Sequence, residues 1–158
     1  LYEMANRDSS QIISVTSSKS QEHTILRDLI LPGLLENLSK NIHETYPQKF
    51  FESGIVFSKG APIKETLSLA CVTASEETHF SEMKAVLQSL LRIGFNIKCE
   101  TKTLPNHVLF SQGRVAEIVV NKKTVGYIGE LDSKVLENFR IRTKVVGFEI
   151  KLSGLIFD

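Results

Sequence analysis

The stretch LRDLILPGLLENLSKNI, residues 26–42, is the densest block of leucine and isoleucine in the chain. Its apolar side chains recur at the spacing of one helix face, and polar side chains fill residues 36–37 and 39–41. Because proline has no N–H, Pro32 is tolerated only in the first turn, so we expect the helix to begin at about Ile30 or Leu31. The stretch therefore predicts an amphipathic helix with one buried face, preceded by an extended segment that contains Arg27.

Composition is that of one globular domain. The chain has 158 residues, of which 42% are hydrophobic and 23% charged, and its formal net charge is +1. No basic run with interleaved aromatic residues is present, which argues against an autonomous nucleic-acid binder. No apolar run approaches the ~20 residues of a membrane span. Cys71 and Cys99 are isolated and predict reduced thiols in a cytosolic protein.

Two kinds of periodicity alternate along the chain. A second helix is expected from Phe80 with Thr78 as its N-cap, and a short third helix is capped by Asp132. The two-residue period of strands, or β-branched and aromatic runs, predicts strands at 12–15, 50–57, 65–74, 95–99, 115–120, 124–128 and 146–152.

This order of elements predicts an α+β fold with a mainly antiparallel sheet flanked by helices. The connection at 121–123 is too short for a parallel crossover. We expect residues 1–158 to form a single domain with a mobile polar lead-in at 1–10. The chain begins with Leu1 rather than methionine, which suggests a fragment of a longer chain, although a processed chain would look the same.

Recognisable catalytic motifs are absent from the sequence. It contains no phosphate-binding glycine loop, no H-E-x-x-H and no paired C-x-x-C. Glu130 and Asp132 are explained by a hydrogen-bonded turn and a helix cap, and the scattered histidines by surface or capping positions, namely His23, His43, His79 and His107. The residues by themselves predict only an α+β domain without an assigned chemistry.

Several ordered segments nevertheless resemble one known family. They are Leu26-Arg27 through Leu35 with Asn41, 51–57, Phe80 with Lys84, 113–116, 125–131 with Val135-Leu136, and 148–150. Their order across about residues 12–152 resembles the core domain of the β subunit of phenylalanine–tRNA ligase (phenylalanyl-tRNA synthetase), in its archaeal or eukaryotic form. That domain is similar in shape to a class II synthetase catalytic module.

The resemblance implies a sheet of six or more antiparallel strands and a cytoplasmic enzyme that attaches phenylalanine to tRNA(Phe) with ATP and magnesium. It further implies that the phenylalanine and ATP sites belong to the α subunit, with which the β core assembles as (αβ)₂. The class II phosphate clamp needs arginines that the strands at 50–54 and 146–152 lack. We therefore expect no catalytic, cofactor-binding or metal-binding residue in this chain.

The framework and interface candidates come from the same matching segments. We expect Arg27 to pair with Glu52, although maintenance of the fold alone would explain each of these positions, above all the glycines. Two other functions remain open: an independent ATP-using enzyme, and a regulatory pseudo-enzyme that binds a small molecule in a polar-tipped pocket over the sheet. The candidates are Arg27, Pro32, Phe51, Glu52, Gly54, Gly126, Gly129 and Glu130.

Overall fold

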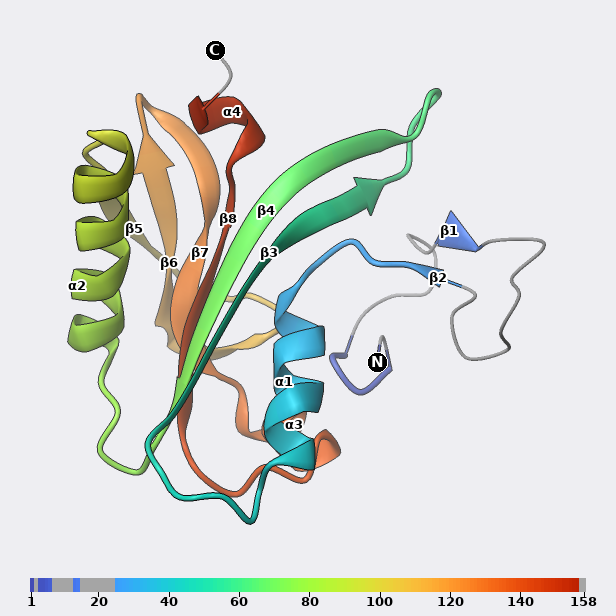
Figure 1. The fold of residues 1–158 in the computed structure, drawn as a ribbon, viewed down its shortest axis with the longest axis vertical. Coiled ribbons are helices and arrows are strands. Elements are labelled where there is room, and N and C mark those ends of the chain that lie inside the picture. The colour runs from blue at the N-terminus through green and yellow to red at the C-terminus, as the bar shows by residue number, and fades with distance from the viewer. Residues whose placement is uncertain (2, 7–12, 15–24, 157–158) are drawn as a thin grey trace.

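A computed structural model describes residues 1, 3–6, 13–14 and 25–156 of the chain. The elements follow one another as shown in Figure 1. They are β1 (Ile13–Ser14), β2 (Ile25–Leu26), α1 (Leu31–Lys40), β3 (Gln48–Ser58), β4 (Lys64–Ala74), α2 (Phe80–Ser89), the π-helical turn η2 (Leu90–Gly94), β5 (Glu100–Leu104), β6 (Phe110–Val120), β7 (Lys123–Leu131), α3 (Ser133–Asn138), β8 (Val145–Lys151) and α4 (Ser153–Ile156).

Six of the strands form one sheet in the order β3-β4-β8-β7-β6-β5, and every neighbouring pair is antiparallel. The predicted α+β fold with a mainly antiparallel sheet is confirmed. Strands β6 and β7 join through Asn121 and Lys122, whose φ angles of 48° and 63° match the primed hairpin turns that suit twisted strands. Strand β8 lies inside the sheet and is buried on both faces up to Lys151.

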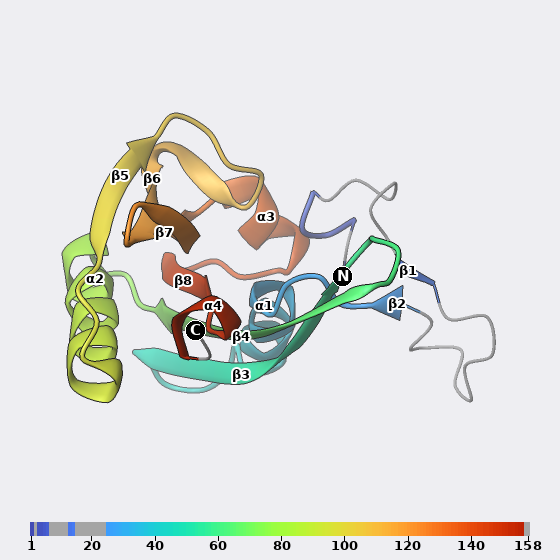
Figure 2. The ribbon, with the colours of Figure 1, turned by 90° about the horizontal axis from the view of Figure 1, so that it is seen from above.

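Helices cover the two faces of the sheet separately (Figures 1 and 2). Helix α2 packs on one face against a core that includes Ile128 and Phe148. Helices α1 and α3 lie over the opposite face, and their apolar side chains share a second core with Val72 and Val145. The leucines at 31, 34, 35 and 38 are all buried, so the predicted apolar stripe of α1 is confirmed for these residues, whereas Ile42, expected as its last member, lies beyond the helix and is exposed. Among the described residues, no helix is long and apolar enough to cross a membrane.

The ends of the helices differ in part from the expected ones. Helix α1 begins at Leu31 as predicted but ends at Lys40, because the Asn41 side chain donates to the Asn37 carbonyl and closes the last turn. The N-cap of α2 is His79 rather than Thr78.

The strand predicted at 95–99 is wrong, since the sheet strand is β5 at Glu100–Leu104. The backbone N–H groups of Asn96 and Ile97 donate to the carbonyls of Arg92 and Leu91. These bonds close the end of η2, and Asn96 adopts a φ of 55° that bends the chain away. The apolar residues of the segment still pack against the core under α2.

The amino-terminal prediction is only partly covered by the described residues. The strand expected at 12–15 is found at Ile13–Ser14, whereas residues 7–12 and 15–24 lie outside the description. Ala5 is fully buried, and the carbonyl of Met4 accepts a bond from the Asn138 side chain. The single domain with a lead-in at 1–10 stays a prediction.

Candidate functional site

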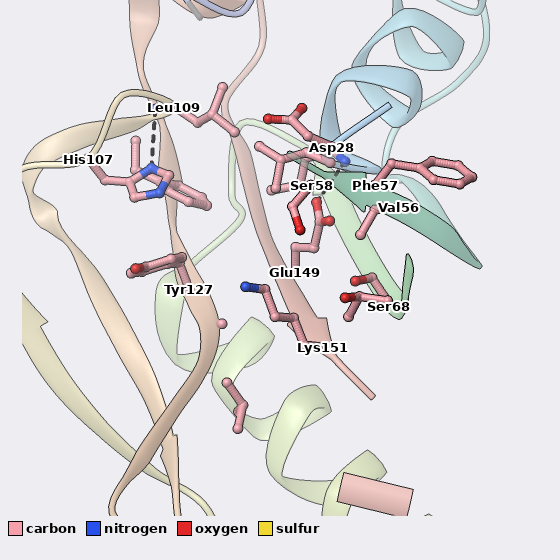
Figure 3. A pocket seen from close by; sticks show the side chains of 16 residues that line it. Asp28, Val56, Phe57, Ser58, Ser68, His107, Leu109, Tyr127, Glu149 and Lys151 are labelled. Carbon is pink, nitrogen blue, oxygen red and sulfur yellow. Dashed lines mark hydrogen bonds between the residues drawn. The ribbon is translucent and has the colours of Figure 1, made fainter. Parts of the chain in front are cut away.

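A cavity of about 360 Å³ lies on the face of the sheet that α1 covers (Figure 3). Its floor comes from β4, β7 and β8, and its walls from the segment before α1, the end of β3 and the segment 107–110. The strand register explains the floor, because Ser68 pairs with Lys151 and Tyr127 pairs with Glu149. Residues two apart on a strand face the same side, so these four side chains share one face.

The Glu149 carboxylate accepts backbone N–H contacts from the start of α1. One carboxylate oxygen accepts from the N–H of Ile30 at 3.0 Å, and the other accepts from the N–H groups of Ile30 and Leu31 at 3.0 Å each. Ile30 is the N-cap of α1 and has no side-chain cap bond of its own. The carboxylate from the inner strand β8 therefore supplies the acceptors that the first turn of the helix needs.

Burial raises the pKa of the Glu149 carboxyl from its ordinary value of 4.5 to about 7. The N–H bonds from Leu31 and Ile30 oppose this effect, the charge of Asp28 adds to it and the charge of Arg27 opposes it. Burial thus opposes ionisation of a carboxyl that caps a helix.

Ser68 and Lys151 also line the floor of the cavity. Ser68 is 1% exposed, and its Oγ has no hydrogen-bond partner among the described residues. Lys151 is exposed at the end of β8, extends toward Tyr127 in Figure 3, and takes part in none of the ion pairs found within the described part of the chain.

Aromatic rings close one side of the cavity. The ring centroids of His107 and Tyr127 are 4.5 Å apart and tilted by 43°, and the ring of Phe110 lies 5.1 Å from that of His107. The Nδ1 atom of His107 accepts from the N–H of Leu109 at 3.3 Å. This bond leaves Nε2 as the protonated ring nitrogen when the imidazole is neutral.

Arg27 and Glu52 form an ion pair at the edge strand β3, and the pairing predicted from the sequence is confirmed. Arg27 Nε also donates to the carbonyl of Ile55 at 3.0 Å, and the Arg27 carbonyl accepts from the N–H of Phe57 at 2.8 Å. A Cβ at Gly54 would lie 2.2 Å from Arg27 Nη2. The glycine therefore provides the space in which the arginine crosses the strand.

The other candidate positions lie apart from this ion pair. Pro32 is buried in the first turn of α1, and Phe51 is 78% exposed on β3. Gly126 lines the cavity, and a Cβ there would lie 2.0 Å from the carbonyl oxygen of Glu149. Gly129 packs in the same close manner against β6, and Glu130 pairs with Arg114 at 2.6 Å. Of the eight positions, Arg27, Glu52 and Gly54 lie together, and their roles beyond these contacts stay predictions.

Sequence reasoning missed Ser68 and Lys151 as site residues and treated Glu149 only as unfavourable for phosphate. In the sequence, polar and apolar residues alternate in β4 and β8 as they do in many ordinary strands, so the alternation does not distinguish these three residues. The unusual feature of Glu149, a carboxylate in a strand with two buried faces, follows from the position of β8 inside the sheet. That position depends on pairing between distant segments, which the local pattern does not reveal.

Comparison with known proteins identifies the family. A family model described as "Phenylalanyl tRNA synthetase beta chain CLM domain" matches residues 1–152. The chain belongs to this family. It is similar to the phenylalanine–tRNA ligase β subunits of Pyrococcus abyssi (37% identity, 98% of this chain and 28% of the relative) and Methanocaldococcus jannaschii (37% identity, 96% of this chain and 28% of the relative). The chain thus spans little more than a quarter of the length of these relatives.

A solved structure supports the fold assignment. The pyrrolysyl-tRNA synthetase PylSc of Desulfitobacterium hafniense superposes with a TM-score of 0.70 at 16% identity, covering 93% of this chain and 52% of the other. The chain therefore has the class II aminoacyl-tRNA synthetase catalytic-like fold, as the resemblance implied. Within the described residues, no group of three or more His, Cys, Asp or Glu side chains could hold a metal ion.

Glu149 gives the unfolding free energy a specific pH dependence. Its folded-state pKa of about 7 exceeds the ordinary 4.5, so between these values the folded state binds a proton that the unfolded state has lost. The resulting stability is fully present below pH 4.5 and is lost as pH rises through 7. It amounts to about 3 kcal/mol. Urea unfolding from about pH 4 to pH 8 measures this slope.

Glu149→Gln should remove that part of the slope, because an amide does not titrate and offers one acceptor oxygen in place of two. Glu137→Gln changes an exposed carboxyl on α3 and serves as the control. An unchanged slope in Glu149→Gln would show that the carboxyl titrates normally in the folded protein.

The Arg27 contacts should contribute modestly to stability. Arg27→Met loses one bond to a carbonyl and one partly exposed ion pair, so we expect the free energy of unfolding to fall by about 1 kcal/mol. Arg142→Met removes an exposed arginine outside this cluster and should change stability by less than about 0.5 kcal/mol. Additive effects of Arg27→Met and Glu52→Gln would contradict a direct coupling.

Proposed function

We propose that this domain is a non-catalytic scaffold of a phenylalanine–tRNA ligase β subunit, which packs against the α subunit. In this proposal the α subunit supplies the chemistry of a cytoplasmic (αβ)₂ enzyme that attaches phenylalanine to tRNA(Phe) with ATP and magnesium. The family assignment supports the subunit role. The observation that carries the scaffold role is an apolar surface whose β3 side chains are exposed and whose β4 side chains are half-buried.

We call this surface the β3–β4 apolar face. Phe51 and Ile55 of β3 are 78% and 39% exposed and pair with Cys71 and Leu67 of β4, and Leu69 lies between these two on β4. The face continues the side of the sheet that α2 covers over the inner strands, where Cys71 is paired with Phe148. An apolar strip at a sheet edge next to a packed layer is suited to a protein partner.

The cavity supports the non-catalytic part of the proposal. A triphosphate needs several cationic groups, and class II chemistry uses arginines for this task. The described residues that line the cavity include the carboxylates Asp28 and Glu149 and no arginine, and Lys151 is their only lysine. This residue set does not fit ATP, because the two carboxylates would repel its phosphates.

Co-purification tests the proposal directly. The chain is co-expressed with an α subunit of the same ligase, and α is recovered through a tag on this chain. Phe51→Asp places a charge at the most exposed apolar side chain of the β3–β4 apolar face, so we expect the recovered α to fall at least about tenfold. The variant should keep the thermal stability of the wild type because Phe51 is already exposed.

Ile93→Asp is the matched control, since Ile93 is 84% exposed on η2, outside the β3–β4 apolar face. Recovery of α by the control but not by Phe51→Asp supports docking through this face. Equal recovery by both variants contradicts it, and no recovery by the wild type contradicts the subunit role itself.

A further inference from the structure

Strand β3 is an edge strand of the sheet, and Figure 2 shows it as the outermost strand on its side. The carbonyl of Ile55 accepts from Arg27 Nε at 3.0 Å, and the N–H of Phe57 donates to the Arg27 carbonyl at 2.8 Å. Arg27 lies outside the six-stranded sheet, so these backbone groups of Ile55 and Phe57 point away from β4. Every second residue of β3, counted from these two, therefore turns its backbone groups outward.

The first half of β3 leaves its outward backbone groups open. By the same alternation, these groups belong to Lys49, Phe51 and Ser53. None of the hydrogen bonds found among the described residues uses the outward N–H and C=O groups of these three residues. We call this stretch, residues 49–53, the open β3 edge. Such a row of unpaired donors and acceptors can pair with a strand from another chain.

The open β3 edge lacks most of the features that protect edge strands. Natural edges carry prolines, bulges or a covering segment. Residues 49–53 contain no proline and pair with β4 without a register shift, whereas Arg27 covers the edge only at residues 55–57. Lys49 is an exposed charge at the start of the stretch, and the Glu52 carboxylate is already paired with Arg27. The backbone of this stretch is therefore regular enough to accept a further strand.

We propose that an extended segment of the α subunit pairs with the open β3 edge as an additional strand of the sheet. This inference rests on the proposed function and adds a backbone contact beside the β3–β4 apolar face. The edge and the face meet at Phe51, whose backbone groups point outward and whose side chain is 78% exposed on the face. A partner strand that pairs with this backbone therefore brings its own side chains next to the Phe51 ring.

A second copy of this chain fits the open β3 edge less well than the α subunit does. Antiparallel pairing of two β3 strands requires a two-fold axis perpendicular to the sheet. The β3–β4 apolar faces of both copies would then lie side by side on one side of the joined sheet and stay exposed. A contact limited to residues 49–53 also falls below the ~1,200 Å² that stable interfaces bury. A partner that covers the face and pairs with the edge meets both requirements.

Ser53→Pro tests the backbone contact in the co-purification with α. Proline removes an outward N–H that has no partner among the described residues, and edge strands tolerate proline at such positions. We expect this variant to recover at least about tenfold less α than Ser53→Ala does. Ser53→Ala is the matched control, because it changes the same side chain, keeps the N–H and should recover as much α as the wild type. Thermal unfolding checks that both variants are folded.

Hydrogen exchange gives a second measurement on the wild-type chain, which decides the question even if the proline variant is unstable. The amides of Phe51 and Ser53 should exchange fast in the chain alone, because they are unpaired among the described residues. Their exchange should slow at least about a hundredfold in the complex with α. The Glu52 amide faces β4 and is the internal control, since it should be protected in both states.

The outcomes separate this inference from the proposed function. If the wild type recovers no α, both fail. If the wild type recovers α but Ser53→Pro recovers as much as Ser53→Ala, strand pairing is overturned while the subunit role stands. Unchanged exchange of the Phe51 and Ser53 amides on binding α overturns it in the same way. A dimer of the chain alone that Ser53→Pro abolishes would assign the open β3 edge to a second copy and would also overturn the inference.

Discussion

A buried carboxylate on the inner strand β8 holds the first turn of helix α1, and much of the domain depends on this contact. The carboxylate of Glu149 accepts three contacts from the N–H groups of Ile30 and Leu31, which are more than a hundred positions away in the chain. The α1 turn has no side-chain cap of its own. The contact therefore fixes where the leucine face of α1 meets the sheet, and it fixes one wall of the cavity at the same time.

The same carboxylate determines what the cavity can accept. A class II catalytic site must bind phosphate groups, which requires fixed cationic side chains. In this chain the cavity on the face of the sheet that α1 covers is lined by Asp28 and Glu149, and burial raises the pKa of the Glu149 carboxyl to about 7. The class II fold is thus present here, and we propose that the lining of this cavity disfavours a triphosphate. The opposite side of the sheet presents apolar side chains at β3, where a scaffold would meet its partner.

Local patterns were enough to predict α1, β3, β4, β6, β7 and β8, because each has a helical period, a two-residue period or a run of β-branched and aromatic residues over at least part of its length. The pairing of Arg27 with Glu52 was predicted from the matching family segments, and the ion pair is present. The strand at 95–99 was mistaken, because an alternating pattern also fits residues that close a helix end against the core. Ser68 and Glu149 could not be recognised as site residues, because their burial depends on which strands are inner ones.

The central claim is that this domain keeps a class II fold without the capacity to bind ATP. Calorimetric titration of the chain with ATP and magnesium tests it most directly. Because two carboxylates face the cavity and no arginine lines it among the described residues, we expect no saturable binding in the micromolar range. Binding of ATP with micromolar affinity would contradict the account and would favour an independent ATP-using enzyme.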